Sequence, residues 1–358
     1  MTGRTMVGVG TLTAGITAEV AADGTVHKGP LAVGWRVRTG NDWVVPSPDR
    51  PGAVRQFRAH PAPVVHTALR IHGGDAIERA YAVGDGDESI VVIEVENDSP
   101  EAIAIGFVVH DGGTRVDGEA VLSLARRPGA VEDDYGLVFP VPHRTKVRVA
   151  LANRAGVDVA ALADAESVFR AWDRILDRGM RTELPEPLQS EVDAARADLL
   201  LAPPSADAFA GLEAWGFDDD AIEMWAHLPM RARRAAKRSA GPGVLGETRA
   251  ALVREVGATI ELVPGFRTAW LGQPIAAHDV PLRAGACSFA VRWHGARPAL
   301  LWDVPPGSVV RAPALDASWS SNEAVGETLL EEPPAPLMAM GERGTRTGTR
   351  VDAPEQFS

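Results

Sequence analysis

The chain has one cysteine among its 358 residues, Cys287. A single cysteine excludes an intrachain disulfide, and its place in the strand-like run GACSFAVRW is typical of a small buried hydrophobic side chain. The nine histidines form neither an H-x-x-x-H nor an H-E-x-x-H motif, the spacings that bring two imidazoles to one metal ion. We therefore expect no metal site and no cofactor.

Lysine is nearly absent, and the formal net charge is -12. An acidic balance argues against nonspecific binding to nucleic acids or anionic lipids. The chain has no run of about 18 consecutive apolar residues, so the sequence predicts no membrane-spanning helix. The N-terminal segment MTGRTMVGVGTLTAG has no apolar signal-peptide core, which makes the cytoplasm the expected compartment.

Residues 1–163 carry short runs of β-branched residues that are separated by turn-forming residues. In SIVVIEVEN, the apolar residues Val91, Ile93 and Val95 share one face of the expected strand. This period of two marks an antiparallel strand with one face on a core. Repeated strands at such spacing predict an N-terminal antiparallel β-sandwich.

The apolar period changes after the sandwich. In DAESVFRAWDRILDRGM, the residues Val168, Trp172, Ile175 and Leu176 recur at helical spacing. We expect four or five helices over residues 164–240. One of them is DDDAIEMWAHL, whose buried face is predicted to include Ile222.

Strand patterns return after the helices. GPGVLGE, residues 241–247, is typical of a linker, and a small β unit is expected over 248–325. Residues 331–358 are rich in Pro, Gly, Thr and charge, which predicts a mobile tail. The predicted fold is therefore mainly β with a helical middle.

Two long stretches carry a family resemblance. They are AWDRILDRGMRTELPEPLQSEVDAARADLLL, residues 171–201, and ELVPGFRTAWLGQPIAAHDVPLRAGACSFAVRWHGARPALLWD, residues 261–303. Together with the preceding sandwich, they resemble the bacterial glucoamylase-like six-hairpin glycosidases over most of residues 55–305. In that family a β-sandwich leads into an (α/α)6 barrel, which a small β domain sometimes follows. The resemblance implies a carbohydrate as the ligand.

The helical part is much shorter than the family's barrel. Six helical hairpins have twelve helices, roughly 140 helical residues at about 11–12 residues each. Only residues 164–239 separate the two β parts of this chain. The rim that holds the family's two catalytic carboxylates is therefore incomplete, and no catalytic residue is transferred from the resemblance.

Acidic residues of the helical part are the remaining candidates for catalysis. Glycoside hydrolysis needs two facing carboxylates about 5–9.5 Å apart. Glu213, Asp219 and Glu223 are the candidates for such a pair. An alternative role for acids such as Asp219 is to stabilise a helix N-terminus.

Tryptophans near the C-terminal end suggest a carbohydrate-binding site formed by Trp270, His294 and Arg297. Sugars present CH faces that pack on an indole, and imidazole and guanidinium groups bind hydroxyls. Trp270 lies in the loop-like stretch RTAWLGQP, which predicts an exposed indole. Trp293 and Trp302 alternate with polar residues on the apolar faces of their strands, which favours the core.

Three hypotheses of function follow. The leading one is a non-catalytic glycan-binding or regulatory protein related to glycoside hydrolases. The first alternative is a glycosidase with a site at the junction of sandwich and helices. The second is a protein–protein assembly factor whose helices pair with a second copy of the chain, which would cover their apolar faces.

Overall fold

The computed structural model describes residues 6–49, 52–125, 131–154, 156–236 and 242–332. The protein is mainly β with helices in its middle, which confirms the fold class predicted from the sequence. It divides into two compact units, the first formed by Met1–Leu176 with Asp193–Ser205 and the second by Asp177–Val192 with Ala206–Ser358. The division therefore runs through the helical middle.

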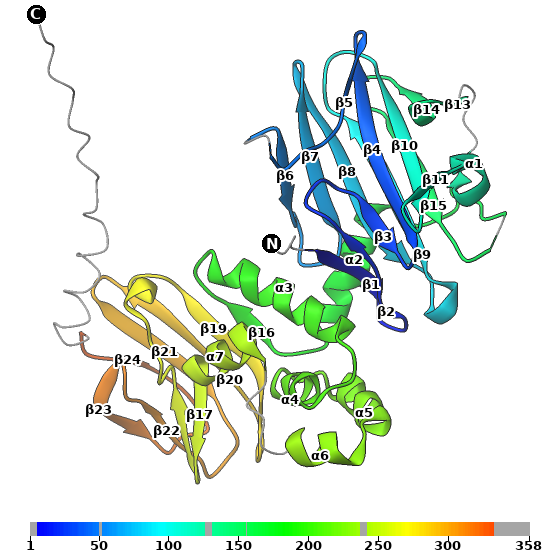
Figure 1. The fold of residues 1–358 in the computed structure, drawn as a ribbon. Helices are drawn as coiled ribbons and strands as arrows, with labels where there is room; N and C mark the ends of the chain where they lie inside the picture. The colour runs from blue at the N-terminus through cyan, green and yellow to red at the C-terminus, as the bar shows by residue number, and fades with distance from the viewer. Residues whose placement is uncertain (1–5, 50–51, 126–130, 155, 237–241, 333–358) are drawn as a thin grey trace, which may run out of the picture. The chain divides into compact units, whose positions relative to one another are not determined.

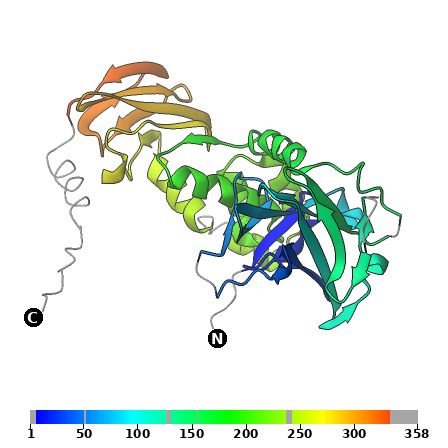
Figure 2. The same ribbon diagram turned by 90° about the horizontal axis from the view of Figure 1, so that it is seen from above.

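The first unit contains a sandwich of two antiparallel sheets (Figure 1), which Figure 2 shows from another side. The nine-stranded sheet consists of β1 (Val7–Thr11), β2 (Gly15–Val20), β3 (Val26–Lys28), β4 (Leu31–Thr39), β5 (Asp42–Val44), β10 (Ile103–Asp111), β11 (Thr114–Val116), β13 (Val131–Asp133) and β14 (Gly136–Val141). Its order is β1-β2-β3-β4-β10-β14-β13, with β5 beside β4 and β11 beside β10.

The six-stranded sheet of the sandwich has the order β12-β15-β9-β8-β7-β6. Its strands are β6 (Val54–Phe57), β7 (Val65–Ile71), β8 (Gly74–Val83), β9 (Ile90–Asn97), β12 (Ser123–Leu124) and β15 (Lys146–Leu151). A 3-10 turn, η1 (Gly86–Glu88), and a one-turn helix, α1 (Gly118–Val121), lie in the connections. The predicted residues Val91, Ile93 and Val95 are all in the core between the sheets.

Residue alternation decides which face of each strand is buried. In β4, Val33, Trp35 and Val37 lie in the core, and the intervening Gly34 and Arg36 are only partly buried. A period of two places these two intervening residues on the outward face of the nine-stranded sheet. Gly34 and Arg36 of β4 therefore both belong to this outward face.

Helix α2 (Ala165–Leu176) packs against β8 of the six-stranded sheet. Of its predicted stripe, Val168, Trp172 and Leu176 are buried and Ile175 is half-buried. Asp164 precedes the helix and accepts a backbone N–H of the first turn through Oδ1, which satisfies one free donor of the helix end. Its side chain explains why the helix begins at this point.

The second unit contains two sheets. The five-stranded sheet has the order β16-β19-β20-β21-β24, formed by β16 (Arg181–Glu183), β19 (Ile275–Leu282), β20 (Gly285–His294), β21 (Arg297–Asp303) and β24 (Val325–Leu329). The four-stranded sheet has the order β17-β18-β22-β23, formed by β17 (Val253–Val256), β18 (Thr259–Leu262), β22 (Val309–Ala312) and β23 (Asp316–Ser321). Between β18 and β19 lies the 3-10 turn η2 (Thr268–Trp270).

The remaining helices are α3 (Leu188–Leu201), α4 (Ala206–Ala214), α5 (Asp218–His227), α6 (Met230–Ala236) and α7 (Gly243–Leu252). The linker predicted over 241–247 is wrong for most of its length, because α7 begins at Gly243 and buries Leu245 and Leu252. The glycines of this segment have low helix propensity, so its sequence did not predict a helix. Tertiary packing stabilises the helix nevertheless.

Ile222 is a second correction, since it is 70% exposed rather than buried. Helix α5 buries Ala221 instead. From residue 333 onward, the predicted tail lies outside the described residues. In the described part of the chain, no helix has the length and apolar character to cross a membrane.

Candidate functional site

The predicted catalytic acids lie on the surface of the helices. Glu213 is near the end of α4, Asp219 and Glu223 are in α5, and all three are exposed. Partial burial and then the charge of the neighbouring Asp218 raise the pKa of the Glu213 carboxyl. Three cavities in the described part of the chain contain none of these acids in their walls.

Trp270 is the clearest correction to the predicted carbohydrate site. Its side chain is only 2% exposed, so the expectation of an exposed indole is wrong. The turn η2 directs the indole inward, where it meets the edge of Phe266 with 5.9 Å between ring centroids. A small β unit needs such large apolar side chains to fill its core.

His294 and Arg297 are exposed at the turn between β20 and β21. The guanidinium of Arg297 donates to the backbone carbonyls of Leu329 and Leu330. Arg297 thus fixes the end of β24, which is a structural role. Because Trp270 is buried, the predicted trio does not form one exposed platform.

The tryptophans that were expected in the core follow the prediction to different degrees. Trp302 is buried and packs over Gly326, where an added Cβ would lie 2.4 Å from the indole. Its Nε1 donates to the carbonyl of Glu323. Trp293 is half-buried, and its Nε1 donates to the carbonyl of Gln273.

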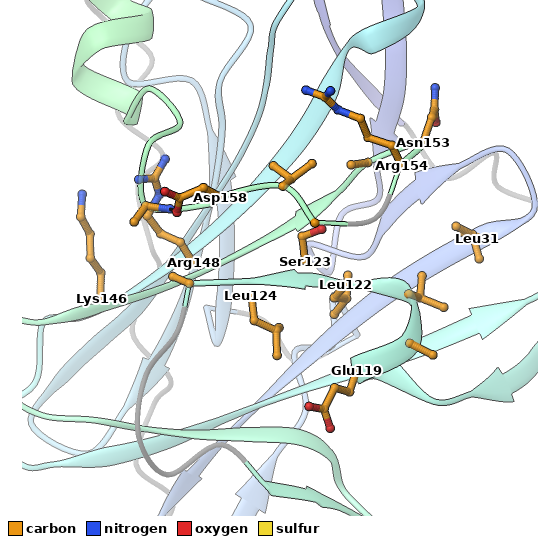
Figure 3. Close-up of a pocket in the computed structure, with 17 residues that line it drawn as sticks. Leu31, Glu119, Leu122, Ser123, Leu124, Lys146, Arg148, Asn153, Arg154 and Asp158 are labelled. Atoms are coloured by element: carbon orange, nitrogen blue, oxygen red, sulfur yellow. Dashed lines mark hydrogen bonds between the residues drawn. The ribbon is translucent and has the colours of Figure 1, made fainter.

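The largest of the three cavities lies in the first unit and has a volume of about 1180 Å³ (Figure 3). Lys146 and Arg148 enter its wall from β15, Arg154 and Asp158 come from the segment that follows β15, and Glu119 comes from α1. Its volume is somewhat above the roughly 300–1,000 Å³ that is typical of small-molecule sites. The described wall contains no aromatic ring on which a sugar packs.

The basic residues of this cavity interact within the protein. Lys146 Nζ lies 3.0 Å from the carboxylate of Glu94. Arg148 donates to the Tyr81 hydroxyl and to two backbone carbonyls, and Arg154 lies 3.9 Å from Glu88. These contacts join the strands and loops of the first unit, so we interpret the cavity wall as mainly structural.

An aromatic pair on the outward face of the nine-stranded sheet is the stronger candidate. Trp43 of β5 stacks on Tyr135, which lies in the turn between β13 and β14, with 5.1 Å between ring centroids and 17° between ring planes. Tyr135 is 45% exposed. The pair therefore presents ring surface to solvent, as a sugar-stacking site requires.

Gly106 of β10 forms the floor beneath this pair. An added Cβ at Gly106 would lie 2.9 Å from the carbonyl oxygen of Tyr135, 3.1 Å from Cγ of Arg36 and 3.2 Å from Cη2 of Trp43. A glycine inside a strand often marks such a close approach. We call Arg36, Trp43, Gly106 and Tyr135 the aromatic surface.

Backbone-directed hydrogen bonds order the turn that carries Tyr135. The carboxylate of Asp133 accepts the N–H of Tyr135 at 2.7 Å. Arg115 of β11 donates to the carbonyls of Asp133 and Asp134. These bonds order the backbone of the turn before any ligand binds, which reduces the entropy lost on binding.

A small cavity of about 160 Å³ lies next to the aromatic surface. Arg36 lines it together with Gly34 and Val108 of the same sheet face, and the polar part of its wall also includes Asp23, Thr25 and His110. A cavity of about this volume can hold a ligand group the size of benzene. Arg36 therefore borders both the ring pair and the cavity.

Neither Trp43 nor Tyr135 was predicted as a site residue from the sequence. Each lies in a short polar stretch, NDWVVP and EDDYGL, with the loop-like composition that surrounds many surface aromatics. Alternation in β4 and β10 predicts the outward position of Arg36 and Gly106. The strand order that brings these segments together is not visible in a local pattern.

In the described residues, no group of three or more His, Cys, Asp and Glu side chains is arranged to hold a metal ion. Comparison with known proteins gives no family: no protein-family model matches the chain, and no curated protein matches it.

Proposed function

We propose that this protein is a non-catalytic carbohydrate-binding protein and that it binds sugar on the aromatic surface. The observation that supports this most is the stacked pair of Trp43 and Tyr135, solvent-exposed at Tyr135 and seated over Gly106. Aromatic side chains offer large, rigid contact area at low cost in conformational entropy. The apolar face of a pyranose ring packs on such rings, and Arg36 supplies hydrogen-bond donors beside them.

We further propose that the chain is related to the six-hairpin glycosidases. The proposal rests on the resemblance of residues 171–201 and 261–303 and on the order of sandwich, helices and β unit. A relative with so short a helical part has lost most of the barrel that surrounds the sugar in the family. Sugar recognition on the sandwich is then an independent feature of this chain.

The test is isothermal titration of the full chain with a panel of oligosaccharides, accompanied by product analysis of every ligand that binds. A ligand at 100 times its Kd also stabilises the fold by about 2.7 kcal/mol, which a thermal shift detects. Tyr135→Ala is expected to weaken binding about tenfold or more, as loss of an aromatic anchor does. Tyr135→Phe keeps the ring and is the matched control, with affinity close to that of the wild type.

Two outcomes contradict the proposal. Turnover of a bound sugar would support the glycosidase alternative and direct attention to Glu213. Absence of binding to every sugar, or equal binding by Tyr135→Ala and the wild type, would reject the aromatic surface as a carbohydrate site. Absence of all binding would favour the assembly-factor alternative.

A further inference from the structure

Arg36 is a partly buried cation with no polar partner among the described residues. Its guanidinium makes neither a hydrogen bond nor an ion pair there, and the guanidinium carbon lies 6.0 Å from the centre of the Tyr135 ring. A guanidinium has five N–H donors. No Arg36 nitrogen is among the fully buried unpartnered atoms of the described residues, so its donors reach solvent and are accessible to an acceptor on a ligand.

Partial burial disfavours the positive charge of Arg36. Burial is the largest cause that lowers its pKa, and the charge of Arg115 is the second, whereas Asp133 and Tyr135 act in the opposite direction. The Asp133 carboxylate is engaged with the Tyr135 amide. An anion bound beside Arg36 would stabilise the positive charge of its guanidinium.

The small cavity that Arg36 lines can hold such an anion. Asp23 on its wall directs Oδ1 to the N–H of Thr25 at 2.9 Å, so this carboxylate is not paired with Arg36. His110 and Thr25 add side-chain donors to the wall. A planar guanidinium binds carboxylate and phosphate groups with two parallel hydrogen bonds.

We infer that the ligand of the aromatic surface is an acidic sugar, whose ring packs on Tyr135 and whose negative group is bound by Arg36 at the small cavity. The inference rests on the proposed carbohydrate-binding function and narrows its ligand class. Two kinds of ligand carry an anionic group on a pyranose ring. The group is the carboxylate of a uronic acid in one kind and the phosphate of a sugar phosphate in the other.

The experiment compares matched neutral and anionic ligands by titration calorimetry of the full chain. One arm uses tetragalacturonate against its methyl ester, and the other uses glucose 6-phosphate against glucose. We expect one anionic ligand to bind about 10- to 100-fold more tightly than its neutral partner, the range of a hydrogen bond to a charged group. The arm that shows the preference identifies carboxylate or phosphate as the source.

Two variants that each remove one positive charge show whether the preference for the anionic ligand depends on Arg36. Arg36→Gln is expected to remove the preference, so that the affinities of this variant for the anionic and the neutral ligand lie within about twofold of each other. Arg38→Gln changes an exposed arginine two residues along β4 and is expected to keep the preference. Circular dichroism of both variants confirms that the sandwich is folded.

The outcomes separate this inference from the function on which it rests. Equal affinity for neutral and anionic partners would overturn the inference and leave carbohydrate binding intact. A preference that Arg38→Gln removes as much as Arg36→Gln does would also overturn it, because a general charge effect would then explain the result. If none of the four ligands binds and the wider oligosaccharide panel also fails, the proposed function itself is rejected.

Discussion

Trp43 and Tyr135 stack on each other on the outward face of the nine-stranded sheet. They come from segments that lie on opposite sides of β10 in the strand order. Trp43 is on β5, which pairs with β4, and Tyr135 follows β13, which pairs with β14. The strands between them are β4, β10 and β14. The two rings meet over β10, where Gly106 leaves the space.

Gly106→Ala is therefore expected to disturb the aromatic surface directly. Its methyl group would lie 2.9 Å from a backbone oxygen and close to Arg36 and Trp43. Overpacking of this kind costs about 1–3 kcal/mol, and the stacked pair has to move apart. Urea unfolding measures the loss of stability, and near-UV circular dichroism reports the changed environment of the aromatic rings.

Gly34→Ala is the matched control, because Gly34 also points outward from this sheet but has its nearest neighbours at 3.8 and 4.0 Å. This variant is expected to keep the stability and the near-UV spectrum of the wild type. A Gly106→Ala protein that behaves in the same way would contradict the role of Gly106 as the floor of the site.

Periodicity predicted the elements whose burial follows a regular pattern. Val91, Ile93 and Val95 of β9 and the stripe of α2 lie in the core as expected. Local composition misled the prediction for Trp270, since a loop-like stretch formed a turn that packs the indole against Phe266. It also misled the prediction for 241–247, where glycines begin a helix.

The candidate site was beyond the reach of local patterns for a different reason. Gly106 and Arg36 are in register on neighbouring strands, and alternation alone places both outward. The approach of Trp43 and Tyr135 depends on which strands are neighbours and on two turns at the sheet edge. Strand order is a property of the whole domain, so the local patterns of a single sequence do not reveal it.

His66 is expected to make the protein less stable in acid. It is buried in β7 between Phe57 and Phe169, and burial and then the charge of Arg79 lower its pKa to about 4, although Glu96 acts in the opposite direction. The unfolded chain takes up this proton near pH 6.5, whereas the folded chain does so only near 4. Stability therefore falls as pH decreases between these values, by at most about 1.4 kcal/mol per pH unit.

His66→Phe removes this titration and also a buried ring nitrogen that has no hydrogen-bond partner among the described residues. We expect a flatter profile of unfolding free energy between pH 6.5 and 4, measured by urea titration at several pH values. His72→Phe, at an exposed position, should follow the wild-type slope. A wild-type slope in His66→Phe would show that another group causes the acid sensitivity.

Glu78 is expected to make the protein less stable as pH rises, which is the opposite of the effect of His66. Its side chain lies in the sandwich opposite Thr67 and is 1% exposed. Burial and then the charge of Asp23 raise its pKa well above 4.5, against a smaller effect of Thr67. The folded chain keeps the proton that the unfolded chain releases above about pH 4.5, so stability is lost as pH rises toward the folded pKa.

Glu78→Gln is nearly isosteric and does not titrate. Its unfolding free energy relative to the wild type should therefore increase with pH above 4.5, by about 1.4 kcal/mol per unit while Glu78 remains protonated. Parallel profiles of the two proteins from pH 4.5 to 8 would show that Glu78 ionises in the folded state as it does in the unfolded state.

Cys287 should serve as a reporter of unfolding in the second unit. It is buried in β20 at 2% exposure, and burial raises the pKa of its thiol from 9.0 to about 12, although Arg249 partly opposes the shift. At pH 8 the thiolate fraction is then about a thousandfold lower than for an exposed thiol. Since it is the single cysteine of the chain, any reaction with a disulfide reagent occurs at this site.

We expect negligible reaction of native protein with Ellman's reagent over minutes and one equivalent after addition of denaturant. In a urea series, the onset of reactivity should follow the loss of structure in the second unit, where Cys287 pairs with Val280 of β19. A probe of the first unit, such as the near-UV signal lost on Tyr135→Ala, shows whether the sandwich unfolds in the same transition. Rapid labelling in the absence of urea would mean that β20 opens locally, because a buried neutral thiol reacts only after it reaches solvent.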